Sequence, residues 1–149
     1  MSDNWLQFVP EELGRQPTKE AAERAVALLS DFTRPLNGDA SARFSEELEF
    51  VSQGANWESV SCPTCGADLW PWWADAADGS AKNQFRDLSV TTPCCGATTT
   101  LHDLNYSWPA GFGRFVLESP NPTVDITPEQ ETFLAACLGM PLRKVWMHI

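Results

Sequence analysis

The sequence predicts an α+β fold in which two helices and four strands surround a cysteine-rich segment. Two stretches repeat apolar residues every three or four positions, which is typical of helices packed on one side. Other stretches are short and rich in bulky residues or alternate apolar with polar residues, as strands do. The cysteines with close spacing all lie between the second and third of these strands. The predicted order is strand, helix, strand, cysteine-rich segment, strand, helix, strand.

The first half of the chain predicts two strands and a helix. Residues 5–9 form a bulky run that stops at Pro10, which lacks a backbone donor, so a strand is expected there. A helix is expected after Thr18, its N-cap, with one apolar face made of Ala22, Ala25, Val26, Leu29 and Phe32. Residues 34–45 carry an Asn-Gly turn signal and are expected to be a loop. Residues 46–51 alternate and predict the second strand.

The second half returns to regular patterns after the cysteines. Residues 56–108 contain many turn residues and little helical periodicity, so loops and short strands are expected. Residues 113–118 alternate and predict the third strand. Thr127, Pro128 and Gln130 predict a capping box with proline at the first helical position. The apolar face of that helix is expected to hold Phe133, Leu134, Cys137 and Leu138. The last strand is expected to place three side chains together: Val145, Met147 and Ile149.

This order of elements is the β-α-β-β-α-β plan of ferredoxin-like folds. Residues 1–55 and 109–149 are then expected to form one α+β domain, and residues 56–108 a subdomain inserted between its second and third strands. A small α+β fold of another kind is the alternative. The 149 residues suffice for a domain with its own hydrophobic core.

Four of the five cysteines lie in two similar stretches, SCPTCGAD at 61–68 and TTPCCGAT at 91–98. Aligned on Pro63 and Pro93, the stretches match at Cys65 and Cys95 and at the Gly-Ala that follows each of them. They differ at two positions, where Cys62 faces Thr92 and Thr64 faces Cys94. Close pairs of cysteines in a reducing compartment indicate metal binding rather than disulfides. A metal site made from both stretches is therefore predicted.

The first stretch resembles the CPxCG knuckle of zinc-ribbon proteins. Two thiolates at this spacing can reach one ion about 2.3 Å away, and the following glycine permits a positive φ. The resemblance implies that both stretches together form a zinc ribbon with a closed, structural Zn²⁺ site of four thiolates: Cys62, Cys65, Cys94 and Cys95. For the fourth ligand, His102 and a water molecule are alternatives to Cys94. An iron–sulfur cluster and buried thiols without metal are further interpretations.

Other reactive side chains have structural interpretations. Cys137 lies on an apolar helix face and is expected in the core. The aspartates at 75, 78 and 87 lack the spacing of a calcium loop and are expected in solvent. His102, Asp103 and Tyr106 could suggest acid–base chemistry, but no nucleophile motif accompanies them, so no enzyme is expected. Residues 105–113 resemble a segment of uncharacterised bacterial proteins, which implies no function.

The tryptophans of the stretch Trp70-Pro-Trp72-Trp73 have two interpretations. They cover the metal site and attach its subdomain to the sheet, or they anchor an interface with another protein. The first interpretation is the more common one for clustered tryptophans in a small metal-binding region.

The charge favours a protein partner. Twenty acidic and ten basic residues give a net charge of −10, which repels nucleic acid phosphates. No run of apolar residues is long enough for a membrane span and no signal peptide is recognisable, so a cytoplasmic protein is expected. We therefore predict a small non-enzymatic zinc-containing protein-binding module, such as an immunity protein or inhibitor that binds a basic partner. A zinc-ribbon regulator associated with nucleic acid is the alternative.

Overall fold

The computed structural model describes residues 3–149 and has a mixed α+β architecture. Four strands form one antiparallel sheet in the spatial order β2-β7-β1-β8: β1 (Asn4–Pro10), β2 (Ser41–Val51), β7 (Gly111–Pro120) and β8 (Leu142–His148). The described residues contain three α-helices: α1 (Lys19–Thr33), α2 (Trp72–Ala81) and α3 (Pro128–Leu138). None of these helices combines the length and apolar character that a bilayer crossing requires.

Short elements occupy the cysteine-bearing segment between β2 and β7. β3 (Val60–Ser61) pairs with β6 (Asn105–Tyr106), and β4 (Ser89–Thr91) pairs with β5 (Thr98–Thr100). One turn of 3₁₀ helix, η1 (Leu101–Asp103), connects β5 to β6. We call residues 56–108 the cysteine region. Its short strands cannot enclose a core of their own, so they depend on neighbouring elements.

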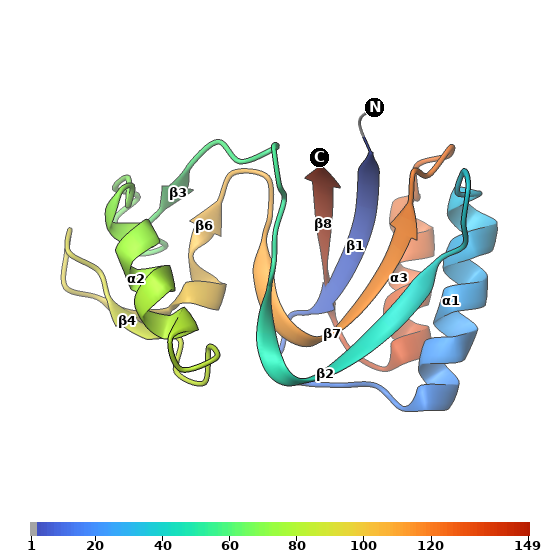
Figure 1. Ribbon diagram of the computed structural model, residues 1–149, viewed down its shortest axis with the longest axis horizontal. Helices are drawn as coiled ribbons and strands as arrows, with labels where there is room; N and C mark the ends of the chain where they lie inside the picture. The colour runs from blue at the N-terminus through green and yellow to red at the C-terminus, as the bar shows by residue number, and fades with distance from the viewer. Residues whose placement is uncertain (1–2) are drawn as a thin grey trace.

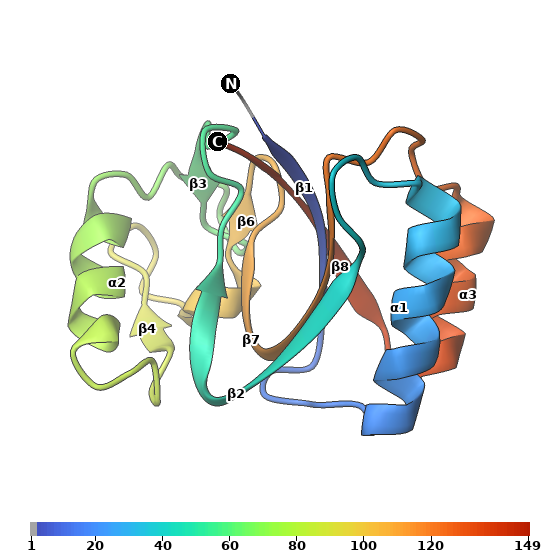
Figure 2. The same cartoon turned by 45° about the vertical axis from the view of Figure 1, so that its right-hand side comes forward.

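The elements form layers on both faces of the sheet. Helices α1 and α3 lie side by side along one face, and α2, β3, β4 and β6 lie on the opposite side (Figures 1 and 2). Both helices begin as their sequences predict. The Thr18 side chain accepts a hydrogen bond from the backbone of Ala21, and Thr127 and Gln130 form a complete capping box.

The main hydrophobic core lies between the sheet and the two long helices. Phe8 of β1 and Phe115 of β7 are fully buried there against Ala25 and Leu29 of α1 and Leu134 of α3. Small alanines on α1 bring the helix close to the aromatic side chains of the sheet. Burying the apolar surface of one such side chain contributes about 2 kcal/mol, so this cluster holds the sheet and both helices together.

A second core connects the cysteine region to the other side of the sheet. Phe112 of β7 is fully buried among Val60, Leu69 and Leu101 of the cysteine region. Phe50 of β2 packs on Phe112 with 5.0 Å between ring centroids. The cysteine region therefore shares its core with β2 and β7.

Three expectations from the sequence were wrong. The cysteine region contains the helix α2, although only loops and short strands were predicted. Strand β2 begins at Ser41, inside the predicted loop 34–45, and pairs with β7 on both sides of a register shift between Phe44 and Glu49. Phe133 was expected on the buried face of its helix, but its side chain is 60% exposed. The face of α3 that packs on the sheet is narrower than the apolar residues suggest.

Candidate metal centre

The two cysteine-bearing loops have the same backbone conformation. In the first loop, the Cys62 N–H donates to the Ala67 carbonyl at 2.9 Å, and the Gly66 N–H donates to the Cys62 carbonyl. In the second loop, Thr92, Ala97 and Gly96 make the same two bonds at the same lengths. Both glycines have a positive φ, 78° and 71°, as the turn requires. The two loops, which are similar in sequence, are therefore also similar in backbone structure.

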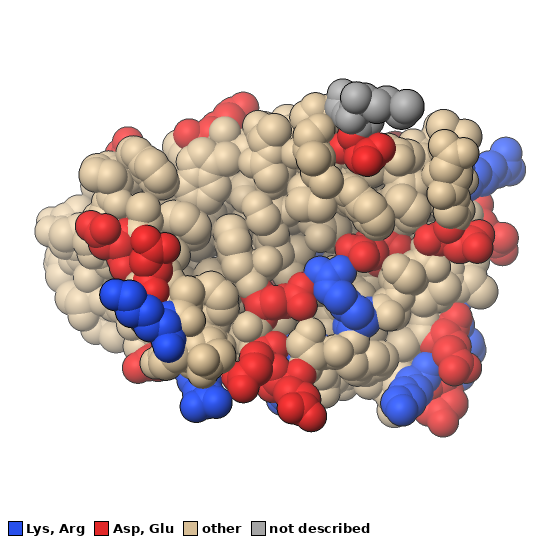
Figure 3. Space-filling model, in the orientation of Figure 1, with Lys and Arg blue, Asp and Glu red and all other residues tan. Residues whose placement is uncertain are grey.

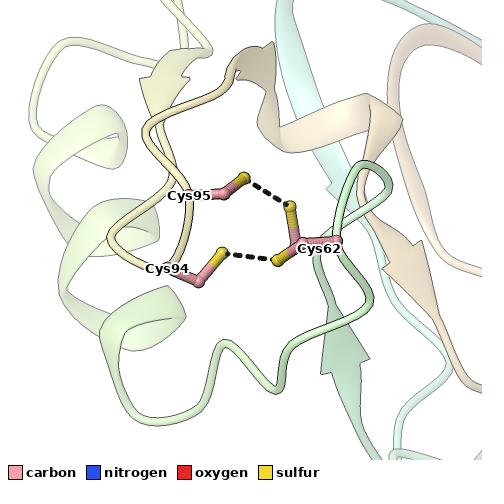
Figure 4. Close-up of side chains that lie close together, drawn as sticks. Cys62, Cys94 and Cys95 are labelled. Atoms are coloured by element: carbon pink, nitrogen blue, oxygen red, sulfur yellow. Dashed lines mark hydrogen bonds between the residues drawn. The ribbon is translucent and has the colours of Figure 1, made fainter.

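The four sulfur atoms of these loops converge. The Sγ atoms of Cys62, Cys65, Cys94 and Cys95 all lie within 4.8 Å of one another. Cys62 and Cys95 face each other across the loops at 3.8 Å, and Cys65 and Cys94 at 3.2 Å. Figure 4 shows Cys94 and Cys95 on one loop pointing across to the loop that carries Cys62. All four predicted ligands are thus brought together by the structure.

This arrangement can hold a metal ion. A tetrahedral site with metal–sulfur bonds of 2.3 Å has sulfur atoms about 3.8 Å apart, which is the separation found between Cys62 and Cys95. The whole donor set consists of soft thiols, which suits zinc and other thiophilic metals. Cys62 is buried and the other three cysteines are exposed, so the cluster lies at the protein surface.

Thr92 completes the inner side of the cluster. Its side chain is buried, and its Oγ1 lies 3.5 Å from Cys95 Sγ and 3.8 Å from Cys62 Sγ. A hydroxyl at this position can donate a hydrogen bond to a thiolate, although it is not itself a soft ligand. The sequence identified Thr92 only as a missing cysteine. Its alignment with Cys62 is the signal that places it next to the sulfur atoms.

The protein favours ionisation of two of the thiols. Backbone N–H groups of Cys65 and Thr64 donate to Cys62 Sγ and lower its pKa to about 6. The Thr92 hydroxyl and the Ala97 N–H lower the pKa of Cys95. The Ala67 N–H acts in the same direction on Cys65, but Cys94, burial and the other sulfur atoms outweigh it and raise the pKa of Cys65 to about 12. Four thiolates at this distance repel one another, and a bound cation would remove that repulsion.

His102, the alternative fourth ligand, lies elsewhere. Its ring is 1% exposed, and both of its nitrogens have backbone partners. Nε2 lies 2.8 Å from the Glu11 carbonyl, and Nδ1 accepts the Phe112 N–H at 2.9 Å. An imidazole with these partners is neutral and protonated on Nε2. Burial, followed by the nearby Arg143, lowers its pKa. His102 therefore connects the cysteine region to Glu11, directly after β1, and to β7, and it is not part of the sulfur cluster.

Arg143 of β8 reinforces this connection. Its Nη1 donates to the carbonyls of His102 and Ala110 at 2.7 and 2.8 Å, and its Nη2 pairs with the Glu11 carboxylate at 2.7 Å. One guanidinium thus joins three segments that are far apart in the sequence. Nothing in the local sequence around Arg143 indicates this role, because its partners are carbonyl groups and not side chains in a motif.

Aromatic side chains form the wall between α2 and the sheet. Trp73 donates from Nε1 to the Tyr106 hydroxyl at 3.0 Å, and Tyr106 donates to the Leu101 carbonyl. Trp57 packs on Trp73 with 4.8 Å between centroids. Trp70 touches this wall at its edge and is 54% exposed. The predicted tryptophan cluster is therefore divided between partly buried positions, Trp72 and Trp73, and the exposed Trp70.

The remaining candidates lie outside the centre. Asp75, Asp78 and Asp87 are exposed, and none of them belongs to the metal-binding group found in residues 3–149. Cys137 packs against the main core, and its thiol donates to the Ala21 carbonyl. Asp103 accepts a hydrogen bond from Thr100. The three aspartates therefore face solvent, and Cys137 and Asp103 make structural contacts.

No family model, curated protein or solved structure matches the chain. The features that bear on function are therefore the sulfur cluster, the two loops that carry it and the surface around them.

Proposed function

We propose that this chain is a small non-enzymatic protein-binding module in which a structural Zn²⁺ ion holds the cysteine region in place. The observation that carries the proposal is the convergence of four sulfur atoms from two loops of the same backbone conformation. Four protein ligands leave no open position for a substrate, which favours a structural over a catalytic metal. Cys62, Cys65, Cys94 and Cys95 would be the ligands.

The arrangement of strands supports a finer description of the fold. The order β2-β7-β1-β8, with all neighbours antiparallel, corresponds to the strand order of a ferredoxin-like sheet. We propose that residues 1–55 and 109–149 form such a domain and that residues 56–108 are a zinc ribbon inserted between its second and third strands. The shared core at Phe112 is consistent with an insertion that folds against its host domain.

The surface of the cysteine region suits a basic protein partner. It carries six acidic residues and only two basic ones: Glu58, Asp68, Asp75, Asp78, Asp87 and Asp103 against Lys82 and Arg86. Acidic side chains are visible over α2 in Figure 3. Trp70 is exposed next to Asp68, whose Oδ1 accepts the Trp70 backbone N–H at 2.9 Å, and Trp57 packs on its ring with 5.9 Å between centroids. An exposed indole beside carboxylates can bind a lysine or arginine side chain through cation–π contact and ion pairing.

We propose a basic protein, bound through the surface around Trp70, as the physiological partner. An immunity protein or inhibitor that neutralises a cationic toxin or enzyme has this chemistry. The net charge of −10 would speed association with such a partner and oppose binding to nucleic acid. A nucleic-acid-associated regulator is the less favoured role, because the cysteine region offers only two cations to phosphate groups.

Affinity capture from the native host tests this proposal. The zinc-loaded chain, immobilised at its N-terminus, should retain a basic protein in stoichiometric amount, and calorimetry with that purified protein should give its Kd. Trp70→Ala should weaken this binding at least about tenfold. Leu36→Ala removes an exposed apolar side chain from the loop between α1 and β2 and should leave the Kd unchanged. Absence of a stoichiometric partner, an acidic partner, or equal binding by Trp70→Ala would contradict the proposal.

A further inference from the structure

A groove runs between α1 and α3 on the outer side of the helical layer. It has a volume of about 550 Å³, and its floor is made of small and apolar side chains from both helices: Ala27, Leu28, Ala136 and Cys137. The exposed ring of Phe133 forms one wall. A large exposed aromatic side chain beside a groove with a small-residue floor is an arrangement that favours burial against another surface.

Two opposite charges border this groove on α1. Arg24 and Asp31 both line it and are seven positions apart in the sequence, so they lie about 10 Å apart along one side of the helix. Ala27 and Leu28 lie midway between them. Neither charged side chain has an ion-pair partner within residues 3–149.

The charges along α1 are complementary to those of a second α1 that runs in the opposite direction. If a second α1 lies antiparallel across the first, with the two-fold axis between Ala27 and Leu28, each Arg24 lies opposite an Asp31 of the other copy. A parallel arrangement would instead place like charges together. The same antiparallel arrangement brings Glu20 towards Arg34, and these two exposed residues also lack an ion-pair partner within the described residues.

We propose that the groove between α1 and α3 is the interface of a symmetric homodimer. A two-fold interface must be complementary to itself, and the order of charges along α1 satisfies that condition. Ala27 at the axis permits close approach of the two helices, and the Phe133 ring of each copy packs against the small-residue floor at the other helix. This interface lies on the far side of the sheet from the cysteine region, so a dimer would present two copies of the surface around Trp70 (Figures 1 and 2).

Charge reversal with sedimentation equilibrium of the full zinc-loaded chain tests this proposal. The wild-type chain should form dimers at micromolar concentrations. Arg24→Asp and Asp31→Arg should each raise the dimer Kd at least about tenfold, because a two-fold dimer then contains two like-charge pairs. The double variant Arg24→Asp/Asp31→Arg should return to within about threefold of wild type, since both pairs become attractive again. Phe133→Ala should raise the Kd. At concentrations where both chains are monomeric it should leave the thermal midpoint unchanged, because this side chain is mostly exposed in one chain.

A control variant shows whether a charge reversal acts through its position in the groove or through the change in net charge alone. Glu23→Arg changes net charge as Asp31→Arg does, but Glu23 does not line the groove, so it should leave the Kd within about twofold of wild type. A wild-type chain that stays monomeric throughout, or single reversals that dimerise as wild type does, would overturn the proposal. Failure of the double variant to recover would also overturn it. All of these outcomes are independent of whether a basic partner binds at Trp70.

Discussion

Thr92 occupies in the second cysteine loop the position that Cys62 occupies in the first. Each donates its N–H to the carbonyl five residues later at 2.9 Å, and each side chain is 1% exposed. The fourth sulfur comes instead from Cys94, two residues further along the same turn and exposed. The cluster therefore contains four sulfur atoms, although the two loops carry them at different positions.

This relationship predicts that the fourth metal ligand can be moved from position 94 to position 92. Cys94→Ser should lower zinc affinity by about 100-fold or more, because a hydroxyl replaces one thiolate. Thr92→Cys/Cys94→Ser should restore most of that affinity, since Thr92 Oγ1 already lies 3.5 and 3.8 Å from two of the sulfur atoms. Competition with a chromophoric chelator measures both values. His102→Ala should bind zinc as wild type does, and recovery absent from the double variant would contradict the assignment of Cys94.

His102 predicts a dependence of stability on pH. Its pKa in the folded chain is lowered from 6.5, so below pH 6.5 the unfolded chain binds more protons than the folded chain. The contribution of His102 to stability should therefore be complete above pH 6.5 and be lost as pH falls towards the folded-state pKa. Urea unfolding of wild type and His102→Gln at several pH values, with excess zinc, measures this difference.

The same variant has an expected effect at neutral pH. His102→Gln should cost about 1–3 kcal/mol, because the buried Phe112 N–H loses a well-placed acceptor. The gap between wild type and variant should narrow as pH falls. A gap that stays constant from pH 7 to pH 5 would show that the histidine does not titrate in this way.

Arg143 is predicted to contribute more to the free energy of unfolding than an exposed arginine does. Arg143→Met should lower the free energy of unfolding by about 2–3 kcal/mol, because the carbonyls of His102 and Ala110 and the Glu11 carboxylate all lose their donor. Arg86→Met is the matched control. Its ion pair with Glu47 is exposed on both sides, so Arg86→Met should change stability by less than about 0.5 kcal/mol. Equal denaturation midpoints for the two variants would disprove the connecting role of Arg143.

Alanine substitutions at two glycines should have opposite effects on stability. A Cβ at Gly113 would collide with the Val9 side chain, so Gly113→Ala should cost about 2 kcal/mol. Gly79 lies inside α2 with no atom near its missing side chain, so Gly79→Ala should stabilise the chain by up to about 1 kcal/mol. Thermal unfolding of both variants checks the close approach of β1 and β7. A Gly113→Ala variant as stable as wild type would contradict the packing at Val9.

The regular elements that the sequence predicted have strong local signals. Thr18 and the pair Thr127 and Gln130 cap the helices as expected, because capping depends on a few neighbouring residues. The two cysteine loops could also be predicted, since their turn needs the same proline and glycine in each copy. The four sulfur atoms were expected to meet, and they do.

The elements that the sequence did not predict depend on tertiary contacts. Helix α2 contains mostly small residues, and only Trp72, Trp73 and Ala76 pack against the second core, so its apolar periodicity is weak. The start of β2 at Ser41 has exposed side chains on an edge strand, which gives no alternation to recognise. The roles of Arg143 and His102 rest on carbonyl and N–H groups from distant segments, which no local pattern encodes.

X-ray absorption spectroscopy of the zinc-loaded chain is the direct test of the four-thiolate metal site. We expect one zinc ion per chain with four sulfur neighbours at about 2.3 Å and no nitrogen or oxygen ligand. Three sulfur neighbours with one nitrogen or oxygen, or a chain that binds no zinc, would contradict this expectation.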